Sequence, residues 1–275
     1  MRLSLSFIWF CGIFGDNERM VHASSLSRHS LLWLVIVTLT GAPACRSTAP
    51  VTPATAPVPG TAPASALPQT EPDSVKWVRL AAEYHAAALQ AYALATTRIE
   101  AAASRPRNTW AVVLDADETV ISNLAYQRER ALAGLPYTSE SWAAWVARRE
   151  ATPIPGASRF MARVRDLGGR IAIVTNRSAA ECDDTQAVFR QHALAYDAML
   201  CRPEKGPSDK NPRFRAVGRG EPFGSGPVEV VLFVGDNILD FPEASQAWRE
   251  QGESAFSEFG RRFVLVPNPM YGSWQ

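Results

Sequence analysis

The apolar positions of the chain first follow a helical period. From Asp73 onward they recur every three or four residues, which predicts one amphipathic helix running to about residue 103. The positions on this face are Trp77, Leu80, Ala81, Tyr84, Ala87, Ala88, Ala91 and Leu94. We expect the aromatic rings among them to pack in a core.

Further along, the pattern changes to short, continuous apolar runs rich in residues that favour strands. These runs cover residues 112–114, 171–174, 230–234 and 263–266. Helix-like segments occur between them, at residues 157–167, 179–193 and 240–250. Buried strands that alternate with helices indicate an α/β fold with a parallel sheet. Because ligands of such sheets bind beyond the carboxyl ends of the strands, polar residues there are the first candidates for a site.

The N-terminal segment has the pattern of a targeting signal. Residues 31–42 are apolar but too few for a comfortable membrane span, and Arg28 and His29 precede them. We expect a secretory signal peptide over residues 1–45, of the lipoprotein type if Cys45 is the lipidated first residue of the mature chain. Pro43 fits that type poorly, and an uncleaved anchor is the alternative. Either Met1 or Met20 is the true start.

Residues 46–72 are rich in Pro, Ala and Thr, which favours an extended, solvated linker. The folded domain is therefore expected over residues 73–275. Hydrophobic residues make up 47% of the chain, enough for a buried core, and the formal net charge is only +1. That balance argues against a broad surface for nucleic-acid polymers and allows a small charged substrate in a local pocket.

The four cysteines stand at positions 11, 45, 182 and 201, with no CxxC pair and no zinc spacing. A metal ion would therefore need oxygen ligands. Export would permit a disulfide between Cys182 and Cys201. We nevertheless expect two separate buried thiols, because the spacing does not show that their Cβ atoms approach.

The first apolar run ends in Asp115-Ala116-Asp117-Glu118-Thr119. Residues two apart in an extended chain point the same way, so the carboxylates of Asp115 and Asp117 can reach one site. One could attack phosphorus while the other moves protons. By itself the pattern also occurs in metal-dependent sugar transferases and in ordinary turns.

The second run ends in Thr175-Asn176-Arg177, where a hydroxyl and the amides that lead into a helix suit phosphoryl oxygens. A plain helix N-cap at Thr175 is the alternative. Lys210 follows in a loop, and its ammonium could neutralise a phosphate or simply be solvated.

The third run ends in Gly235-Asp236-Asn237, with Asp240 four residues after Asp236. If this turn opens a helix, the two carboxylates lie one turn apart on the same face. Their repulsion near Asp115 would be relieved by Mg²⁺, which prefers a few carboxylates together with water and phosphate oxygens. Helix capping by either aspartate is the alternative.

The order of these elements resembles the haloacid dehalogenase superfamily, and more specifically its class C acid phosphatases. That family includes bacterial outer-membrane lipoproteins that act as 5′-nucleotidases. The resemblance covers roughly residues 75–275. It rests on DADETV, Trp142-Ala-Ala-Trp145-Val146, Pro155-Gly156-Ala157, Thr175-Asn176-Arg177, Lys210-Asn-Pro-Arg213-Phe214, VLFVGDN and Pro267-Asn268-x-x-Tyr271-Gly272-x-Trp274.

The resemblance implies a Rossmann-like sheet with an N-terminal helix and a small α-helical lid at about residues 120–155. It also implies that Asp115 forms an aspartyl-phosphate, that Asp117 is the general acid and base, and that Thr175, Asn176 and Lys210 bind the phosphate. Mg²⁺ is then ligated by Asp115, Asp236 and the backbone carbonyl of Asp117, with support from Asp240.

The same resemblance places aromatic side chains of the lid and the C-terminus beside the substrate's base, here Tyr137, Trp142 and Tyr271. Packing of the lid is the alternative, and we prefer it for Trp145. Two departures stand out: Ala116 replaces a larger apolar residue, and residues 122–126 read Ser-Asn-Leu-Ala-Tyr, unlike the usual Asp-Asn-Ser-Pro-Tyr.

We therefore predict an exported, Mg²⁺-dependent acid phosphatase, periplasmic or anchored in the outer membrane of a bacterium. Its leading substrates are nucleoside 5′-monophosphates. The alternatives are a broad-specificity acid phosphatase and a surface-binding lipoprotein that keeps the fold without turnover. The oligomeric state cannot be predicted.

Overall fold

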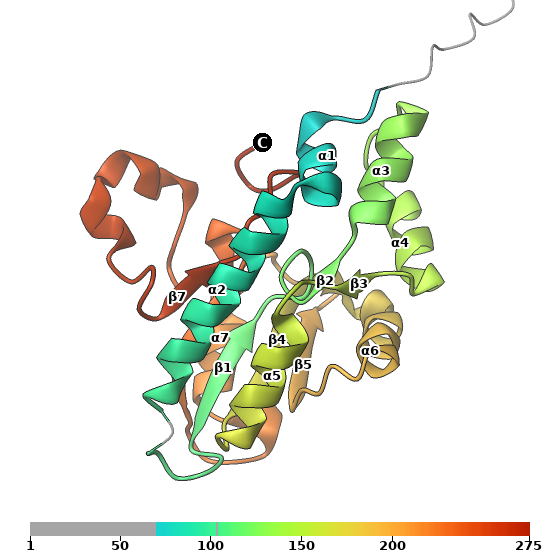
Figure 1. The fold of residues 1–275 in the computed structure, drawn as a ribbon. Coiled ribbons are helices and arrows are strands. Elements are labelled where there is room, and N and C mark those ends of the chain that lie inside the picture. Colours follow the sequence, from blue (N-terminus) through green and yellow to red (C-terminus); the bar gives the residue numbers. More distant parts are fainter. Residues whose placement is uncertain (1–69, 103) are drawn as a thin grey trace, which may run out of the picture. The chain divides into compact units, whose positions relative to one another are not determined.

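A computed structural model of the chain describes residues 70–102 and 104–275. The expected signal peptide at 1–45, with Cys45, and all but the last three residues of the expected linker lie outside these residues. The described part is built around a five-stranded parallel sheet (Figure 1) in the order β5-β4-β1-β6-β7. Its strands are β1 (Trp110–Leu114), β4 (Arg170–Ser178), β5 (Ala198–Arg202), β6 (Glu229–Gly235) and β7 (Phe263–Leu265). The predicted α/β fold with a parallel sheet is confirmed.

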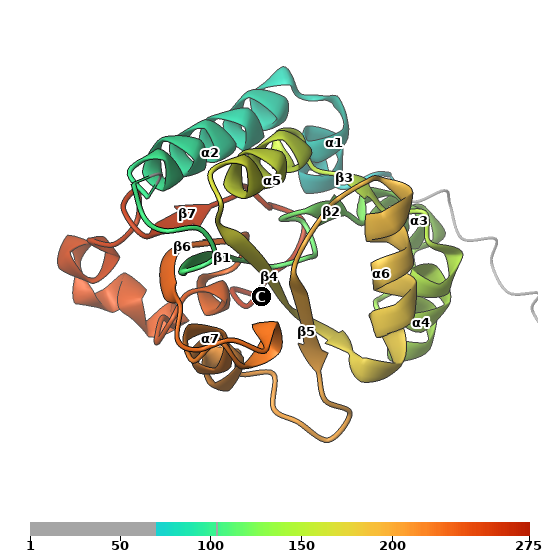
Figure 2. The ribbon, with the colours of Figure 1, turned by 90° about the horizontal axis from the view of Figure 1, so that it is seen from below.

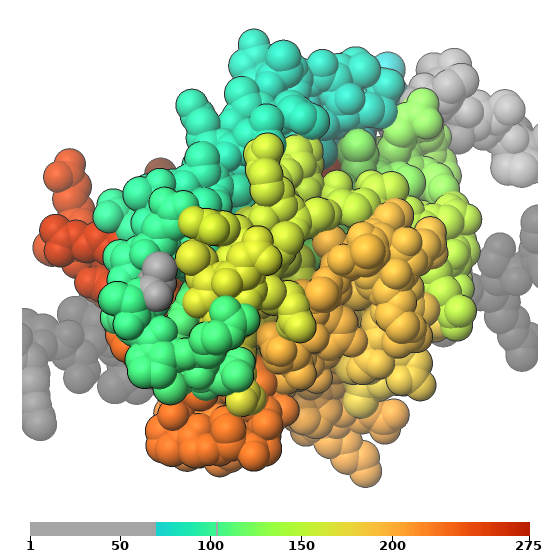
Figure 3. Space-filling model, turned by 60° about the horizontal axis from the view of Figure 1, so that its bottom comes forward, coloured from blue at the N-terminus to red at the C-terminus, as the bar shows by residue number. Residues whose placement is uncertain are grey.

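Helices cover both faces of this sheet. Figures 2 and 3 show α5 (Ala157–Asp166) between α2 (Ala82–Glu100) and α6 (Cys182–Gln191) on one face. The other face carries α7 (Asn211–Gly218). Four short 3₁₀ turns follow α7 in the chain: η2 (Glu221–Phe223), η3 (Ile238–Asp240), η4 (Gln246–Gln251) and η5 (Glu253–Phe256). Alternate residues of β1 point to opposite faces, so Val112 and Leu114 pack with one helical layer and Ala111 and Val113 with the other.

The expected single N-terminal helix is two helices. The first, α1 (Asp73–Leu80), ends at Ala81, whose backbone is extended, and α2 begins at the next residue. The two helices pack on different partners: Val75 and Val78 of α1 contact the C-terminal segment near Met270, whereas α2 packs on α5 and the sheet. Tertiary packing therefore overrides the continuous helical period, and Leu80 and Leu94, both on the expected apolar face, are exposed.

Three further expectations about the elements were wrong. Strand β5 was not predicted, because it has no β-branched or aromatic residue and forms an edge of the sheet. Residues 240–250 form no α-helix but the end of η3 and part of η4. Strand β4 does not end at Thr175 but continues to Ser178, and only the single turn η1 (Ala179–Glu181) precedes α6.

The segment between β1 and α5 forms a small helical hairpin on a two-stranded base. The base pairs β2 (Ile121–Ser122) with β3 (Thr152–Pro153) in antiparallel fashion. The helices α3 (Leu124–Ala133) and α4 (Ser139–Arg148) come between these two strands in sequence, in the range where a lid is expected (Figure 1). Thr138 caps α4 by accepting a hydrogen bond from the Ser141 amide at 3.1 Å, which fixes the start of that helix.

Cys182 and Cys201 form a disulfide that joins the first residue of α6 to β5, with their Cα atoms 6.0 Å apart. The expectation of two separate thiols was wrong, because the β4–α6 connection brings two cysteines 19 residues apart in sequence to bonding distance. Within the described ranges, no helix has the length and apolarity that a membrane span requires.

Candidate active site

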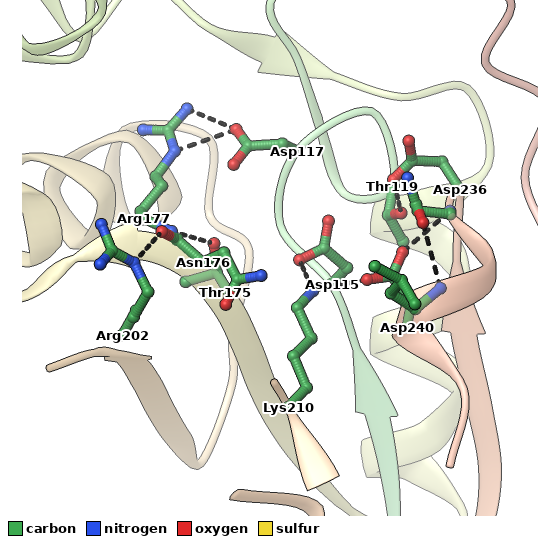
Figure 4. Close-up of polar contacts among 12 residues, drawn as sticks. Asp115, Asp117, Thr119, Thr175, Asn176, Arg177, Arg202, Lys210, Asp236 and Asp240 are labelled. Carbon is green, nitrogen blue, oxygen red and sulfur yellow. Dashed lines mark hydrogen bonds and ion pairs between the residues drawn. The ribbon is translucent and has the colours of Figure 1, made fainter. Parts of the chain in front are cut away.

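Three aspartates and a lysine meet at the carboxyl ends of β1 and β6. Oxygen atoms of Asp115, Asp236 and Asp240 lie within 4.8 Å of one another. The Lys210 Nζ donates to Asp115 Oδ1 at 2.5 Å and to Asp240 Oδ1 at 2.6 Å. Figure 4 shows Lys210 beside Asp115, with Asp236 and Asp240 on the far side from Thr175. The tertiary fold thus brings together four of the residues predicted for the site.

Burial and mutual repulsion disfavour the charged forms of these carboxyl groups. Burial raises the pKa of Asp115 to about 7, Lys210 opposes this rise, and Asp240 adds to it. Burial also raises the pKa of Asp236, to which Asp240 and Asp115 contribute further. A divalent cation among these oxygens would remove the repulsion, and hard oxygen donors suit such an ion. The donor set therefore fits a divalent metal.

The turn after β6 places Asp236 and Asp240 differently from the expected helix. Asp236 directly follows the strand, and Asn237 caps the 3₁₀ turn η3, in which Asp240 is the last residue. The Asp240 Oδ2 accepts a hydrogen bond from the Asn237 amide at 2.9 Å. A Cβ at Gly235 would lie only 2.3 Å from the Asp240 Cβ, so glycine is required for this close approach.

Asp236 is held from two sides. Thr119 Oγ1 donates to its Oδ1 at 3.1 Å, and Asn268 Nδ2 donates to its Oδ2 at 2.8 Å. Thr119 belongs to the turn after β1, whereas Asn268 belongs to the C-terminal segment. Two distant parts of the sequence therefore orient one carboxylate of the cluster.

Asp117 lies on the same turn as Asp115 but pairs with another residue. Arg177 donates to its Oδ1 from Nε at 3.0 Å and from Nη2 at 2.8 Å, as Figure 4 shows. Burial lowers the pKa of Arg177, but Asp117, with smaller contributions from Tyr271 and Glu118, raises it. The net pKa is raised, so the guanidinium stays charged. The side chain of Asp117 is 19% exposed, whereas that of Arg177 is 1% exposed.

Thr175 lies inside β4 and is completely buried, so it is not a helix N-cap. Its Oγ1 accepts a hydrogen bond from the Arg177 amide at 3.1 Å. Asn176, the next residue, lines the cavity, and its Oδ1 accepts from Arg213 Nη2 at 2.6 Å. The Thr175-Asn176 pair thus lies within the last part of β4, across from the aspartate cluster (Figure 4).

A cavity of about 640 Å³ opens above these groups. Asp115, Asp117 and Lys210 form part of its lining, and so do the three predicted aromatic residues, Tyr137, Trp142 and Tyr271. Trp145 lies in the core instead and donates from Nε1 to Asn123 Oδ1 at 2.9 Å, as its packing interpretation predicts.

Glu118 is a buried carboxyl group that sequence reasoning did not single out. Its backbone has a left-handed φ of 51°, and its side chain accepts hydrogen bonds from the Asn123 amide at 2.7 Å and from the Tyr271 hydroxyl. Burial raises the pKa of Glu118 to about 7, with a further contribution from Asp117. Glu118 therefore joins the active-site turn to the lid and to the C-terminal segment.

Arg177, Asn123 and Asn268 were also missed as functional residues. One signal for Arg177 was present: it stands two positions after Thr175, and alternate residues of a strand share a face. That signal depends on β4 continuing past Thr175, which the apolar pattern did not indicate. Asn123 and Asn268 both stand in stretches compared with the family, but no residue pattern indicated their hydrogen bonds. Asn123 reaches back to Asp117 and Glu118, whereas Asn268 reaches Asp236, 32 positions away.

Comparison with known proteins agrees with this geometry. Residues 37–274 match the family model of the HAD superfamily, subfamily IIIB (acid phosphatase). The class C acid phosphatase of Bacillus anthracis is a similar solved structure, with 28% identity and a TM-score of 0.65. That match covers 74% of this chain and 85% of the other, and a second structure, of the Bacillus anthracis enzyme with tungstate bound, matches equally well.

The chain therefore belongs to the subfamily IIIB acid phosphatases of the HAD superfamily. Within that superfamily it is an acid phosphatase of the class C type, a hydrolase of phosphate monoesters. Enzymes of this superfamily generally use a divalent metal, and the buried cluster of Asp115, Asp236 and Asp240 fits such an ion.

Proposed function

We propose that the protein is a Mg²⁺-dependent acid phosphatase that hydrolyses nucleoside 5′-monophosphates through an aspartyl-phosphate. The observation that carries the proposal is the position of Asp115. It is a buried carboxylate of the aspartate cluster, paired with Lys210, and it lines a cavity that also has three aromatic residues in its wall.

Asp115, Asp236 and Asp240 are the residues proposed to hold Mg²⁺, together with the backbone carbonyl of Asp117. Their close oxygen atoms and their burial support a small, hard cation. The ion would supply positive charge to the phosphoryl oxygens and relieve the repulsion among the carboxylates.

In the proposed reaction, an oxygen of Asp115 forms a bond to phosphorus while the bond to the leaving oxygen breaks. Lys210, Thr175 and Asn176 stabilise the transferred group. Asp117 gives a proton to the leaving oxygen and then takes one from the water that cleaves the aspartyl-phosphate. An acidic optimum follows, because Asp117 must begin protonated.

The nucleotide preference rests on the aromatic wall. Tyr137, Trp142 and Tyr271 all line the cavity, and a base that stacks on an aromatic ring gains about 1–3 kcal/mol. The Tyr271 ring is held in place by its hydroxyl's hydrogen bond to Glu118. A broad-specificity acid phosphatase remains the second candidate, and membership of a phosphatase family weighs against a non-catalytic binding protein.

The first experiment measures phosphate release by protein that lacks residues 1–69. The substrates are 5′-nucleotides, 3′-nucleotides, sugar phosphates and an aryl phosphate, with Mg²⁺ or chelator, near pH 5 and pH 7. We expect Mg²⁺-dependent release that favours 5′-nucleotides and is faster at the lower pH. Similar rates on all substrates would remove the nucleotide preference and keep the chemistry.

Two variants test the active site itself. Asp115→Asn should abolish turnover without loss of the fold, and the exposed Asp166→Asn serves as its control. Tyr137→Ala should reduce kcat/KM for nucleotides about fivefold or more, but much less for an aryl phosphate. Phe256→Ala, which removes an aromatic residue outside the cavity, is the control. Activity in Asp115→Asn would refute the covalent mechanism.

We also propose that the protein is exported and lipidated at Cys45. The apolar run at 31–42 supports export, and so does the Cys182–Cys201 disulfide, because disulfides persist in oxidising compartments. Labelling of bacterial cells with radioactive palmitate should mark the wild-type chain and not Cys45→Ser. Equal labelling of both would exclude this anchor.

A further inference from the structure

One oxygen of Asp117 receives three hydrogen bonds. Arg177 donates two of them, from Nε at 3.0 Å and from Nη2 at 2.8 Å, and Asn123 Nδ2 donates the third at 2.8 Å. All three end on Oδ1. Within residues 70–102 and 104–275, no side chain or amide donates to Oδ2. The two oxygens of this carboxyl group are therefore in different environments.

Burial and a further hydrogen bond restrain the Arg177 side chain beside Asp117. Arg177 is 2% exposed, and its Nη1 donates to Thr185 Oγ1 at 3.1 Å. The Thr185 hydroxyl in turn donates to the Glu181 carbonyl at 2.8 Å, inside the first turn of α6. The Arg177 backbone thus belongs to β4, and its guanidinium is hydrogen-bonded to α6.

Asn123 is also held in place by buried hydrogen bonds. It is completely buried, and its Oδ1 accepts from Arg177 Nη2 at 3.0 Å and from Trp145 Nε1 at 2.9 Å. Its own amide and its Nδ2 donate to the two carboxylate oxygens of Glu118 at 2.7 and 3.0 Å. Because all these contacts are buried, Asn123 is a rigid second donor to Asp117.

We propose that Arg177, together with Asn123, is the positioning residue that sets Asp117 as general acid, with its transferable proton on Oδ2. This inference rests on the proposed function. Three donors saturate Oδ1, so only Oδ2 is left to carry a proton toward the cavity. In the first step the Oδ2–H bond breaks and the proton passes to the leaving oxygen. That oxygen keeps the electron pair of the broken P–O bond. In the second step Oδ2 takes a proton from the attacking water.

The same residue joins the acid to the aromatic wall. The Arg177 guanidinium carbon lies 5.3 Å from the ring centroid of Trp142, which lines the cavity. A substrate that packs on Trp142 therefore lies beside the group that orients Asp117. Arg177 therefore contacts both Trp142, on which the substrate packs, and Asp117, which donates the proton.

A merely structural ion pair predicts a different result from a positioning pair. Loss of a structural pair would lower activity on all substrates alike, through the fraction of folded protein. Loss of proton-donor alignment instead penalises leaving groups that need a proton. An alkyl alcohol, such as the 5′-hydroxyl of a nucleoside, needs one, whereas p-nitrophenolate leaves without it.

The test compares a nucleoside 5′-monophosphate with p-nitrophenyl phosphate in the Mg²⁺-loaded enzyme. The rate measured is leaving-group release in a single turnover with saturating enzyme, because the later hydrolysis of the aspartyl-phosphate is the same for both substrates. For Arg177→Gln we expect this release rate to fall on the nucleotide by about tenfold or more beyond its fall on p-nitrophenyl phosphate, because general acid catalysis contributes about 10²–10⁴. Asp117→Asn should show the same selectivity to a larger degree. Arg165→Gln, which loses an exposed arginine, should show none.

Equal losses on both substrates in folded Arg177→Gln would overturn the proposal. If that variant does not fold, Arg177→Lys decides, because it keeps the buried charge but lacks the planar fork that reaches Oδ1 twice. Arg177→Lys should show the same selective loss on the nucleotide. Equal losses on both substrates in this variant would again overturn the inference. A wild-type enzyme inactive on every substrate would refute the proposed function instead.

Discussion

The Nζ of Lys210 lies 2.5 Å from Oδ1 of Asp115, although 95 positions separate the two residues in sequence. Both side chains are almost completely buried, and the same Nζ also contacts Asp240. Burial lowers the pKa of Lys210, but Asp115 and Asp240 outweigh it, so the net pKa is raised and the ammonium stays charged. Lys210 is thus the positive charge that the structure provides within the aspartate cluster.

Replacement of Lys210 by Met should therefore impair both stability and catalysis. Removal of one partner of a buried ion pair costs about 3–5 kcal/mol, and removal of a group that stabilises the transition state costs about 10²–10³ in kcat. Thermal unfolding in chelator at pH 7 and phosphatase assays with Mg²⁺ measure the two effects. Lys76→Met, in an exposed pair, is the control. Near wild-type activity in Lys210→Met would contradict this role.

The raised pKa of Asp115 predicts how stability depends on pH in the absence of a metal ion. Its pKa is about 7 in the folded protein, mainly through burial, and near its ordinary value of 3.8 in the unfolded chain. Between these values the folded protein binds more protons, so its stability falls as pH rises from about 4 to 7.

Mg²⁺ should oppose this fall, because it replaces the proton as the balancing positive charge. We expect the rise in Tm on addition of Mg²⁺ to be larger at pH 7 than at pH 5, as measured by thermal unfolding in matched buffers. Asp115→Asn should reduce the pH dependence in chelator. An Mg²⁺ effect that is equal at both pH values would argue against a metal site at these carboxylates.

Gly235 should be essential for the position of Asp240. An alanine Cβ would lie 2.3 Å from the Asp240 Cβ and 2.6 Å from its Oδ2, so the carboxylate must move. We expect Gly235→Ala to raise the Mg²⁺ concentration for half-maximal activity by about 10–100-fold. A Mg²⁺ titration of activity measures this. Gly218→Ala is the matched control, since nothing lies within 4 Å of its added Cβ, and equal titration curves would refute the argument.

The Cys182–Cys201 disulfide should stabilise the β4–α6–β5 region. A closed loop of this length, with a sequence separation of 19, is worth about 3 kcal/mol in the chain-entropy account. The double variant Cys182→Ser, Cys201→Ser should have a correspondingly lower Tm. Reduction by dithiothreitol should lower the Tm of the wild type but not that of the variant. A wild-type Tm that does not respond to dithiothreitol would show that the bond contributes nothing.

Much of the fold follows from the local pattern of the chain. The apolar runs that become β1, β4, β6 and β7 can be recognised in the sequence, because a strand buried on both faces must be apolar at consecutive positions. Polar residues at the ends of such strands converge on one edge of the sheet, so Asp115 and Asp236 could be assigned to one site. The order of the motifs was enough to indicate the family that the comparisons confirm.

The tertiary structure decided the contacts that join distant segments. No period in the sequence indicates that Asp117 pairs with Arg177, 60 positions away, or that Cys182 reaches Cys201. The break at Ala81 likewise depends on what α1 and α2 pack against. The physical reason is the same in each case: hydrophobic periodicity records which side of an element is buried. Partners, distances and breaks depend on how the elements are then packed in three dimensions.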